Sequence, residues 1–195
     1  MSTPDCLSSL TLVRHAETEW SLTGLHSGRS DVPLTDAGRT CASELGAELR
    51  GHSFGRVLTS PLSRARETAR LAGFPHADDD PDLLEWDYGE IEGMTTPQIR
   101  EQRGSDWLVW HDGAPGGESA DDVAARVDRV IARVATGGVD ALVFAHGDVL
   151  RVLAARWLEQ PAVFGSRLIL GTCSISVLGY ERGIRSIVSW NDRAR

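Results

Sequence analysis

The stretch LTLVRHAETEW, residues 10–20, joins a short apolar run to an arginine, a histidine and two acids. Consecutive apolar residues predict a strand that is buried on both faces, as in a parallel sheet covered by helices. Arg14 and His15 follow that strand, and α/β sheets bind ligands beyond the carboxyl ends of their strands. Taken alone, an Arg-His pair fits an exposed loop as well as an anion site, so the other segments of the chain must be considered.

Apolar runs and helical patterns alternate along the rest of the chain. Further strands are predicted at residues 57–59, 141–145, 175–178 and 184–188, and helices at 34–51, 60–73, 118–138 and 147–158. This alternation predicts an α/β fold with a mostly parallel sheet. The acidic segment 74–82 is expected to be an exposed loop. A length of 195 residues suits one domain, 1–195.

Start signals and apolar stripes define the predicted helices. Thr35 is expected to be an N-cap, and Ser60 another, with Pro61 in the first turn. Ser119 and Asp122 are spaced as a capping box. Apolar residues at helical spacing predict the buried faces, namely Ala42, Leu45 and Leu49 in one helix and Val123, Val127, Val130 and Val134 in another.

Composition and charge limit the classes of partner. The chain has 20 basic and 28 acidic residues, a net charge of −8, which argues against a nucleic acid or an anionic membrane as partner. No apolar run approaches the roughly 20 residues of a membrane span, and no signal peptide is expected. Cys6, Cys41 and Cys173 are scattered, so a reduced, cytoplasmic setting is expected. A homodimer remains open.

The polar residues that follow the predicted strands suit chemistry at a phosphoryl group. Arg14 and Arg64 offer planar guanidinium groups that stay charged and meet two oxygens at once. The helix after Ser60 adds backbone N–H groups at its start. His15 is the candidate nucleophile, because no cysteine lies in a Gly-rich, arginine-ended turn and no DxD pair follows a strand.

Two more residues complete the predicted machinery. His146 follows the strand at 141–145 and is placed to donate a hydrogen bond to a phosphoryl oxygen. Glu85 lies among apolar and aromatic residues, whose burial would raise its pKa and suit it to protonate a leaving group. Asp87, Glu90 and Glu92 are rival acids in the same segment.

Four segments together resemble the signatures of the histidine phosphatase superfamily, in its phosphoglycerate mutase-like branch. They are LVRHAETEW (12–20), TSPLSRARETA (59–69), LLEWDYGEIEG (83–93) and VFAHGDVLR (143–151). The resemblance implies a three-layer α/β/α sandwich with one antiparallel strand, in the C-terminal hairpin. It also implies that His15 is the nucleophile, that Arg14, Arg64 and His146 hold the phosphate, and that Glu85 is the proton donor, with no metal ion or cofactor.

A finer resemblance links the chain to the acid phosphatase and sedoheptulose-bisphosphatase type members. It rests on residues 20–35, 85–101 and 106–119. The substrate-binding residues that follow from this reading are Ser21, His26, Ser27, Gly28, Ser60, Tyr88, Glu90 and Arg151. The chain departs from the mutase pattern, since Ser21 follows Trp20 where many relatives have asparagine, and residues 25–28 lack a common basic residue.

The favoured function is metal-independent hydrolysis of small phosphate monoesters, either sugar or carboxylic acid phosphates, through a phosphohistidine. The chain lacks the longer middle insertion of mutases, and a shorter lid favours water over return of the phosphoryl group. The alternatives are a phosphoglycerate mutase and a catalytically silent sensor of a phosphorylated ligand. A small phosphorylated metabolite is the expected partner, beside the homodimer that remains open.

Several other residues have an ordinary structural reading. His52 and His76 are expected at the surface, as are Arg66 and Arg70 on their helix. His111 has the same reading, with a place at the site entrance as its alternative. Trp107 and Trp110 are expected to pack a lid onto the sheet, with an apolar wall over the substrate as the alternative.

Overall fold

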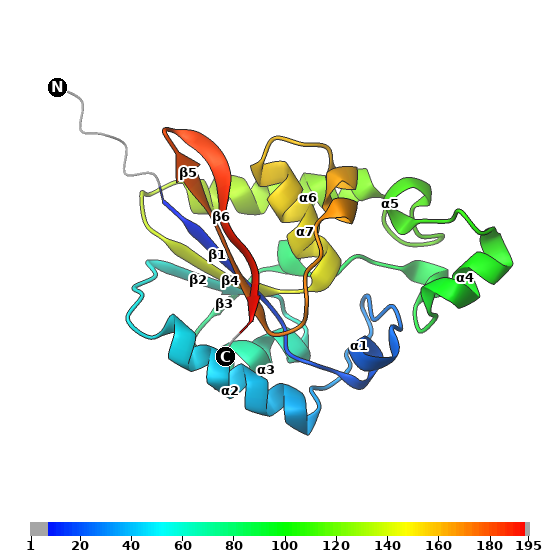
Figure 1. The fold of residues 1–195 in the computed structure, drawn as a ribbon, viewed down its shortest axis with the longest axis horizontal. Helices are drawn as coiled ribbons and strands as arrows, with labels where there is room; N and C mark the ends of the chain where they lie inside the picture. The colour runs from blue at the N-terminus through cyan, green and yellow to red at the C-terminus, as the bar shows by residue number, and fades with distance from the viewer. Residues whose placement is uncertain (1–7, 194–195) are drawn as a thin grey trace.

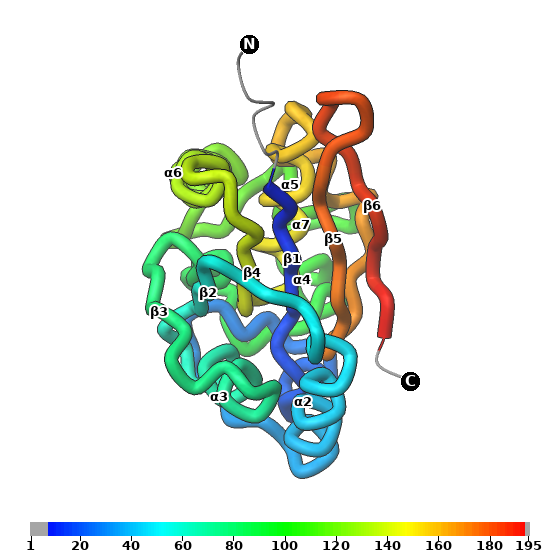
Figure 2. The backbone as a smooth tube through the Cα atoms, turned by 90° about the vertical axis from the view of Figure 1, so that its left-hand side faces the viewer, coloured from blue at the N-terminus to red at the C-terminus, as the bar shows by residue number. Residues whose placement is uncertain are grey.

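The computed structural model describes residues 8–193, and its centre is one six-stranded sheet. The strand order is β3-β2-β4-β1-β5-β6, which Figure 2 shows side by side. In chain order the strands are β1 (Leu10–Arg14), β2 (Arg56–Thr59), β3 (Asp78–Asp79), β4 (Ala141–Ala145), β5 (Ser174–Glu181) and β6 (Ile184–Arg193). All five predicted strands are present.

Strand direction follows the prediction. β1, β4, β2 and β3 pair in parallel, whereas β5 runs antiparallel to both of its neighbours, β1 and β6. β5 is therefore the one reversed strand, and it belongs to the C-terminal hairpin. β3 was not expected, because its two residues lie in the segment predicted to be a loop and both side chains are exposed. It has no apolar pattern that a sequence could reveal.

Helices cover both faces of the sheet, as Figure 1 shows. α2 (Asp36–Leu49) and α3 (Ser63–Leu71) lie on one face, and α6 (Ala120–Ala135) and α7 (Gly147–Trp157) lie on the other. The fold is thus the expected three-layer α/β/α sandwich. Shorter segments complete it, namely α1 (Glu19–Thr23), α4 (Thr96–Arg103), α5 (Val109–Asp112) and the 3₁₀ turns η1 (Pro81–Leu83), η2 (Gly89–Ile91) and η3 (Ala162–Arg167).

Most predicted helix starts are confirmed. The Thr35 side chain accepts a hydrogen bond from Gly38 N–H, and Ser119 and Asp122 form a capping box. The prediction for α3 was wrong, since the helix begins at Ser63 and Leu62 occupies the N-cap position. Ser60 is instead drawn into the interior, where its hydroxyl is paired with a histidine described below. A serine before a proline does not by itself distinguish these two uses.

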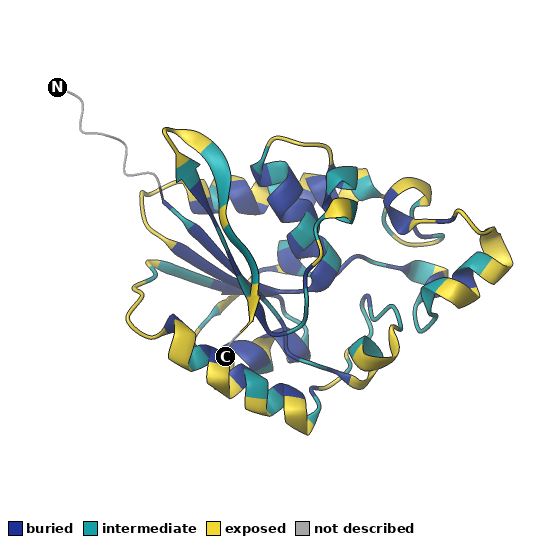
Figure 3. Cartoon of the chain, in the orientation of Figure 1, coloured by how far each residue is buried: buried dark blue, intermediate teal, exposed yellow. Residues whose placement is uncertain are grey.

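The core is divided by the sheet into two apolar clusters, and Figure 3 shows the buried strands between helices with exposed outer faces. Both predicted apolar stripes are buried. They are Ala42, Leu45 and Leu49 on the inner face of α2, and Val123, Val127, Val130 and Val134 on the inner face of α6. Each such valine or leucine contributes about 1.5–3 kcal/mol when removed from water. Among residues 8–193, no helix combines the length and the apolar character needed to cross a bilayer.

The cysteines depart from expectation. Cys41 of α2 and Cys173, which precedes β5, form a disulfide, so the prediction of reduced thiols is wrong for this pair. The two residues are 132 positions apart in sequence, and only the fold brings them together. The backbone N–H of Cys173 donates to the carbonyls of Arg14 and His15, at 3.2 and 3.1 Å. Cys6 lies outside the described residues.

Reduction of this disulfide is expected to lower the free energy of unfolding by about 3–5 kcal/mol, because the closed loop is long and its loss frees the unfolded chain. Urea denaturation with and without a dithiol reductant measures the change. The Cys41→Ser/Cys173→Ser double variant should match the reduced protein and should not respond to reductant. Identical denaturation midpoints for the oxidised and reduced protein would contradict the expectation.

Candidate active site

Two neighbouring parallel strands bring the first site residues together. β1 and β4 pair so that Arg14 lies opposite Ala145, and His15 N–H donates to the Ala145 carbonyl at 2.8 Å. His146 follows Ala145 directly, so both histidines leave the sheet at the same edge. Their ring centroids lie 5.1 Å apart. The parallel register therefore accounts for the convergence of two motifs that are far apart in sequence.

His15 is held in one tautomer. Its Nδ1 lies 2.7 Å from the Ala16 carbonyl oxygen, which only accepts, so Nδ1 carries the proton. The lone pair is then on Nε2. The side chain is 3% exposed, and burial lowers the pKa of His15 well below its ordinary value, with further lowering by the charges of Arg64 and Arg14. A neutral ring with a free lone pair is the form that attacks phosphorus.

Arg14 presents an unused donor. Its Nη1 donates to the Leu170 carbonyl at 2.5 Å, but its buried Nε has no hydrogen-bond partner within residues 8–193. Gly147 permits the close approach of the guanidinium, since a Cβ there would lie 3.2 Å from the guanidinium carbon. A buried N–H without a partner is costly. An oxyanion in the pocket would satisfy it.

Arg64 is fully buried and fixed by three neighbours. Its Nε donates to His146 Nδ1 at 3.1 Å, one terminal nitrogen donates to the Ser30 carbonyl at 2.7 Å, and the other to the Gly28 carbonyl at 2.9 Å. Burial is the main cause that lowers the pKa of Arg64, and Glu85 opposes it. The guanidinium stays charged, because arginine does not deprotonate in proteins. Its orientation is thus set before any ligand arrives.

His146 differs from the expectation. Because its Nδ1 accepts from Arg64, its Nε2 carries the proton and donates to Ser60 Oγ at 2.7 Å. Both ring nitrogens are engaged, so the ring offers no free donor to a phosphoryl oxygen in this structure. Burial and the charges of Arg64 and His15 keep the pKa of His146 well below its ordinary value. The ring's direct contact is with Arg64, whose orientation it helps to fix.

Glu85 lies against the N-terminus of α7. Its carboxylate accepts hydrogen bonds from the backbone N–H groups of Val149 at 3.0 Å, Asp148 at 3.2 Å and Trp86 at 3.0 Å. The side chain is 7% exposed, and burial raises its pKa, as does the negative charge of Asp148. The three N–H groups oppose that rise. A carboxyl with a raised pKa is suited to donate a proton.

A buried arginine that the sequence did not single out supports the Glu85 segment. Arg126 donates to the carbonyls of Leu84 at 2.6 Å and Glu85 at 3.2 Å. It also forms a two-pronged pair with the Glu118 carboxylate, at 2.8 and 3.1 Å. Arg126 lies beside Val127 on the apolar face of α6. A charged residue on an otherwise apolar helix face is a sequence signal that could have identified it.

Arg14, His15, Arg64 and Glu85 line one cavity of about 280 Å³. Its wall includes four of the five predicted catalytic residues and five of the predicted substrate-binding residues. The lining consists of Arg14, His15, Ser21, Gly24, Leu25, His26, Ser27, Arg64, Glu85, Tyr88, Thr96, Gly147, Asp148 and Arg151. The catalytic and binding roles of the predicted residues stay predictions, but the side chains do meet in one place.

Three of the predicted substrate-binding residues and His146 lie outside this wall. Ser60 is fully buried beneath His146, and Gly28 contributes its carbonyl to Arg64 rather than a surface to the cavity. Glu90 points outward, with its side chain 70% exposed and paired with Arg103 at 3.4 Å. The helix start also differs, because Ser63 N–H at the start of α3 donates to Asp31 and is not offered to the pocket.

Residues 10–193 match the sequence profile of the histidine phosphatase superfamily (branch 1). The chain belongs to this superfamily. An acid phosphatase of Mycobacterium tuberculosis is 42% identical over 187 residues, covering 91% of this chain and 89% of that protein. A sedoheptulose 1,7-bisphosphatase of Saccharomyces cerevisiae is 36% identical over 187 residues, covering 80% and 68%. The solved structure of an open reading frame product of Mycobacterium tuberculosis aligns with a TM-score of 0.92 and 40% identity, covering 96% and 99%.

In this member of the histidine phosphatase superfamily, a second group of polar residues lines the cavity beside the buried arginines. We call this group, formed by His26, Tyr88, Asp148 and Arg151, the outer lobe. Tyr88 OH donates to Asp148 at 2.7 Å, and Arg151 donates to the other oxygen of Asp148 at 2.6 Å. The Arg151 guanidinium also lies 4.5 Å from the centre of the Trp110 ring. His26 adds its ring, 4.7 Å from Tyr88 between centroids. Asp148, which the sequence analysis did not single out, is thus the centre of this lobe.

The residues of this phosphatase that were expected to have structural rather than functional roles lie outside the cavity wall. His52, His76 and His111 are exposed, and His111 lies outside the cavity wall. Arg66 and Arg70 are also exposed. Trp107 and Trp110 are both buried at 7% exposure, and neither lines the cavity. Trp110 packs edge-on against Trp86, a loop residue, so it has a packing role, although this contact is not with the sheet; neither tryptophan forms an apolar wall of the cavity.

Proposed function

We propose that the protein hydrolyses small phosphate monoesters through a covalent phosphohistidine on His15, without a metal ion. The observation that supports this most directly is the His15 Nε2 lone pair at the wall of a cavity shared with Arg14, Arg64 and Glu85. The proposal treats residues 1–195 as one catalytic domain, which the match over residues 10–193 supports.

The first half-reaction transfers the phosphoryl group to the protein. Nε2 of His15 attacks phosphorus, the new P–N bond forms, and the P–O bond to the alcohol breaks. Glu85 gives its proton to the departing oxygen, so the alcohol leaves neutral. The guanidinium groups of Arg14 and Arg64 neutralise the charge on the three phosphoryl oxygens as it redistributes in the transition state.

The second half-reaction returns the protein to its starting state. Glu85, now ionised, takes a proton from a water molecule, and the hydroxide oxygen bonds to phosphorus. The P–N bond breaks, inorganic phosphate forms, and His15 recovers its lone pair. Each group therefore ends in the protonation state in which it began. The ring does not need to titrate in the cycle, which suits its lowered pKa.

The outer lobe supports small polyhydroxylated or acidic esters as substrates. Ser27, His26 and Arg151 supply donors and acceptors to the part of the ligand beyond phosphate. A cavity of about 280 Å³ suits a metabolite rather than a phosphoprotein loop. The similarity to an acid phosphatase and to a sedoheptulose 1,7-bisphosphatase points to the same range of esters.

A panel of phosphate esters tests the proposal. Sugar phosphates, sugar bisphosphates, phosphoglycerates and p-nitrophenyl phosphate are incubated with the protein, and free phosphate is measured against the His15→Ala variant as background. The best ester is expected to reach a kcat/KM of at least about 10⁴ M⁻¹s⁻¹. Chelation of divalent metals should leave the rate unchanged.

The same panel separates the alternatives. Isomerisation of 3-phosphoglycerate that depends on a bisphosphoglycerate primer, with little free phosphate, would identify a mutase instead. Binding of phosphate esters without release of phosphate and without a trapped phosphoenzyme would identify a sensor. Either result would replace the proposed hydrolysis.

A further inference from the structure

Glu92 holds a loop on which the buried Arg64 depends. Its carboxylate accepts hydrogen bonds from the backbone N–H of Arg29, from Ser30 N–H at 3.1 Å and from Ser30 Oγ at 2.5 Å. It lies outside the cavity wall and so does not touch the reacting atoms. Two adjacent residues thus donate three hydrogen bonds to one carboxylate. Hydrogen bonds to a charged acceptor are stronger than hydrogen bonds to a neutral one, so this attachment is specific.

Gly28 allows Glu92 to come this close. A Cβ at Gly28 would lie only 1.8 Å from Glu92 Oε1, so no larger residue fits beside the carboxylate. Gly28 also has a φ of +35°, in the region that favours glycine. The backbone of residues 28–30 is thus wrapped around the Glu92 side chain.

The same short loop carries the acceptors that orient Arg64. The carbonyls of Gly28 and Ser30 accept hydrogen bonds from the two terminal nitrogens of the guanidinium. The Asp31 carboxylate accepts hydrogen bonds from both the N–H and the hydroxyl of Ser63, at the start of α3. Residues 28–31 therefore connect Glu92 on one side with α3 and its arginine on the other. A shift of this loop would move two of the three contacts that fix Arg64.

We propose that Glu92 is a positioning residue that sets the orientation of the Arg64 guanidinium through residues 28–30. The inference rests on the proposed function, since it assigns Arg64 to the phosphoryl group. Without the carboxylate, the N–H groups of Arg29 and Ser30 lose their acceptor and the loop relaxes towards water. The carbonyls of Gly28 and Ser30 then no longer define one position for the guanidinium. A misaligned donor loses most of its effect on a transition state.

The test compares Glu92→Ala and Glu92→Gln with wild type. For Glu92→Ala we expect kcat/KM for p-nitrophenyl phosphate to fall by about 30–100-fold, and the dissociation constant for inorganic phosphate to rise by about tenfold. Glu92→Gln should fall between wild type and Glu92→Ala in both measurements, because its single amide oxygen can accept from only one of the two N–H groups, which donate to different oxygens of Glu92.

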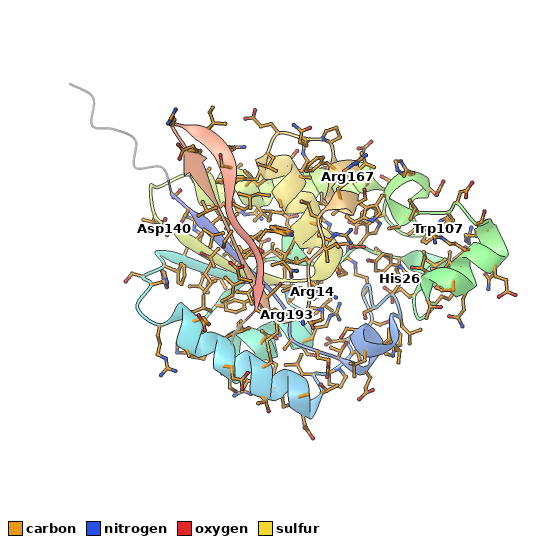
Figure 4. The ribbon with its side chains drawn as sticks, viewed as in Figure 1. Arg14, His26, Trp107, Asp140, Arg167 and Arg193 are labelled. Carbon is orange, nitrogen blue, oxygen red and sulfur yellow. A yellow bond between two sulfur atoms is a disulfide. The ribbon has the colours of Figure 1, made fainter. Side chains whose placement is uncertain are left out.

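A control variant separates positioning from general stability. Asp140 also accepts a hydrogen bond from a backbone N–H, that of Ser9 at 2.7 Å, but it lies at the opposite end of the sheet from His26 of the cavity wall (Figure 4). Asp140→Ala should lower the melting temperature without changing kcat/KM or phosphate affinity. Wild-type kcat/KM and phosphate affinity in Glu92→Ala, with only a lower melting temperature, would overturn the inference.

Phosphate affinity, measured by calorimetry, keeps this test independent of turnover. A wild-type protein that binds phosphate but hydrolyses no ester would reject the proposed function, while a weaker affinity in Glu92→Ala would still support the positioning role. A wild-type protein that hydrolyses esters, with a Glu92→Ala variant equal to it in both measurements, would reject the positioning role alone.

Discussion

Replacing His15 with alanine is expected to lower kcat for phosphate ester hydrolysis by at least about 10⁴-fold, as removal of a covalent nucleophile does in other enzymes. The physical reason is that His146, whose ring lies nearest to His15, cannot take over the attack, because both of its nitrogens are engaged with Arg64 and Ser60. Rapid acid-free quenching with a radiolabelled ester should trap a phosphorylated wild-type protein. The label should be stable to base and lost in acid, as a P–N bond requires.

The matched control for this experiment is His76→Ala, since His76 is exposed and lies outside the cavity wall. That variant should keep wild-type activity and the trapped label. If His15→Ala retained even a tenth of wild-type kcat, or still carried label on a histidine, His15 would not be the nucleophile.

Replacing Glu85 with glutamine is expected to have the second largest effect, and the effect should depend on the leaving group. For an alkyl phosphate, kcat/KM should fall by about 10²–10⁴-fold, the usual contribution of a positioned acid. For p-nitrophenyl phosphate the fall should be much smaller, because nitrophenolate leaves without a proton. Comparison of the two esters therefore distinguishes loss of proton donation from general damage to the pocket.

The pH dependence of kcat/KM provides a second test of proton donation by Glu85. His15 attacks only when neutral, so kcat/KM rises as the pH increases through its lowered pKa. Glu85 donates only when protonated, so kcat/KM falls as the pH increases through its raised pKa. The wild-type optimum for alkyl esters should lie between the lowered pKa of His15 and the raised pKa of Glu85, and Glu85→Gln should lose the fall at higher pH.

Glu101→Gln, an exposed change on α4, is the control for this pair of measurements. An equal loss for both esters in Glu85→Gln, or an unchanged pH profile, would mean that another group is the acid. Asp148 would then be the next residue to examine, because it is the only other carboxylate that lines the cavity within residues 8–193.

The sequence predicted the framework of the site better than its details. Buried strands are continuous apolar runs, and the residues that follow them must meet at one edge of a parallel sheet. This is why Arg14, His15 and His146 were found as candidates without coordinates, whereas Glu85 was chosen for its apolar surroundings. The antiparallel β5 and the capping box at Ser119 were also predicted, because family pattern and local spacing carry that information.

What could not be predicted depends on contacts between distant segments. Ser60 and Glu90 lie outside the cavity wall, which their motifs could not reveal, since a side chain's direction is not encoded in its motif. The pairing of Cys41 with Cys173 joins residues 132 positions apart, which spacing does not reveal. The importance of Arg126 could have been inferred from a charge within an apolar stripe, but its acceptors are backbone carbonyls of another segment.

The disulfide makes the two sides of the catalytic cavity unequal in stiffness. It ties α2 to the backbone that touches the Arg14 and His15 carbonyls, so the end of the cavity that holds these two residues is fastened covalently. The opposite rim is formed by α1, which has no buried residue, and α4, which has one, Ile99. Segments with few buried contacts open most readily. We therefore expect this rim to adjust its position to esters of different shape. Substitutions in the rim can change the range of accepted substrates without altering the residues at the other end of the cavity.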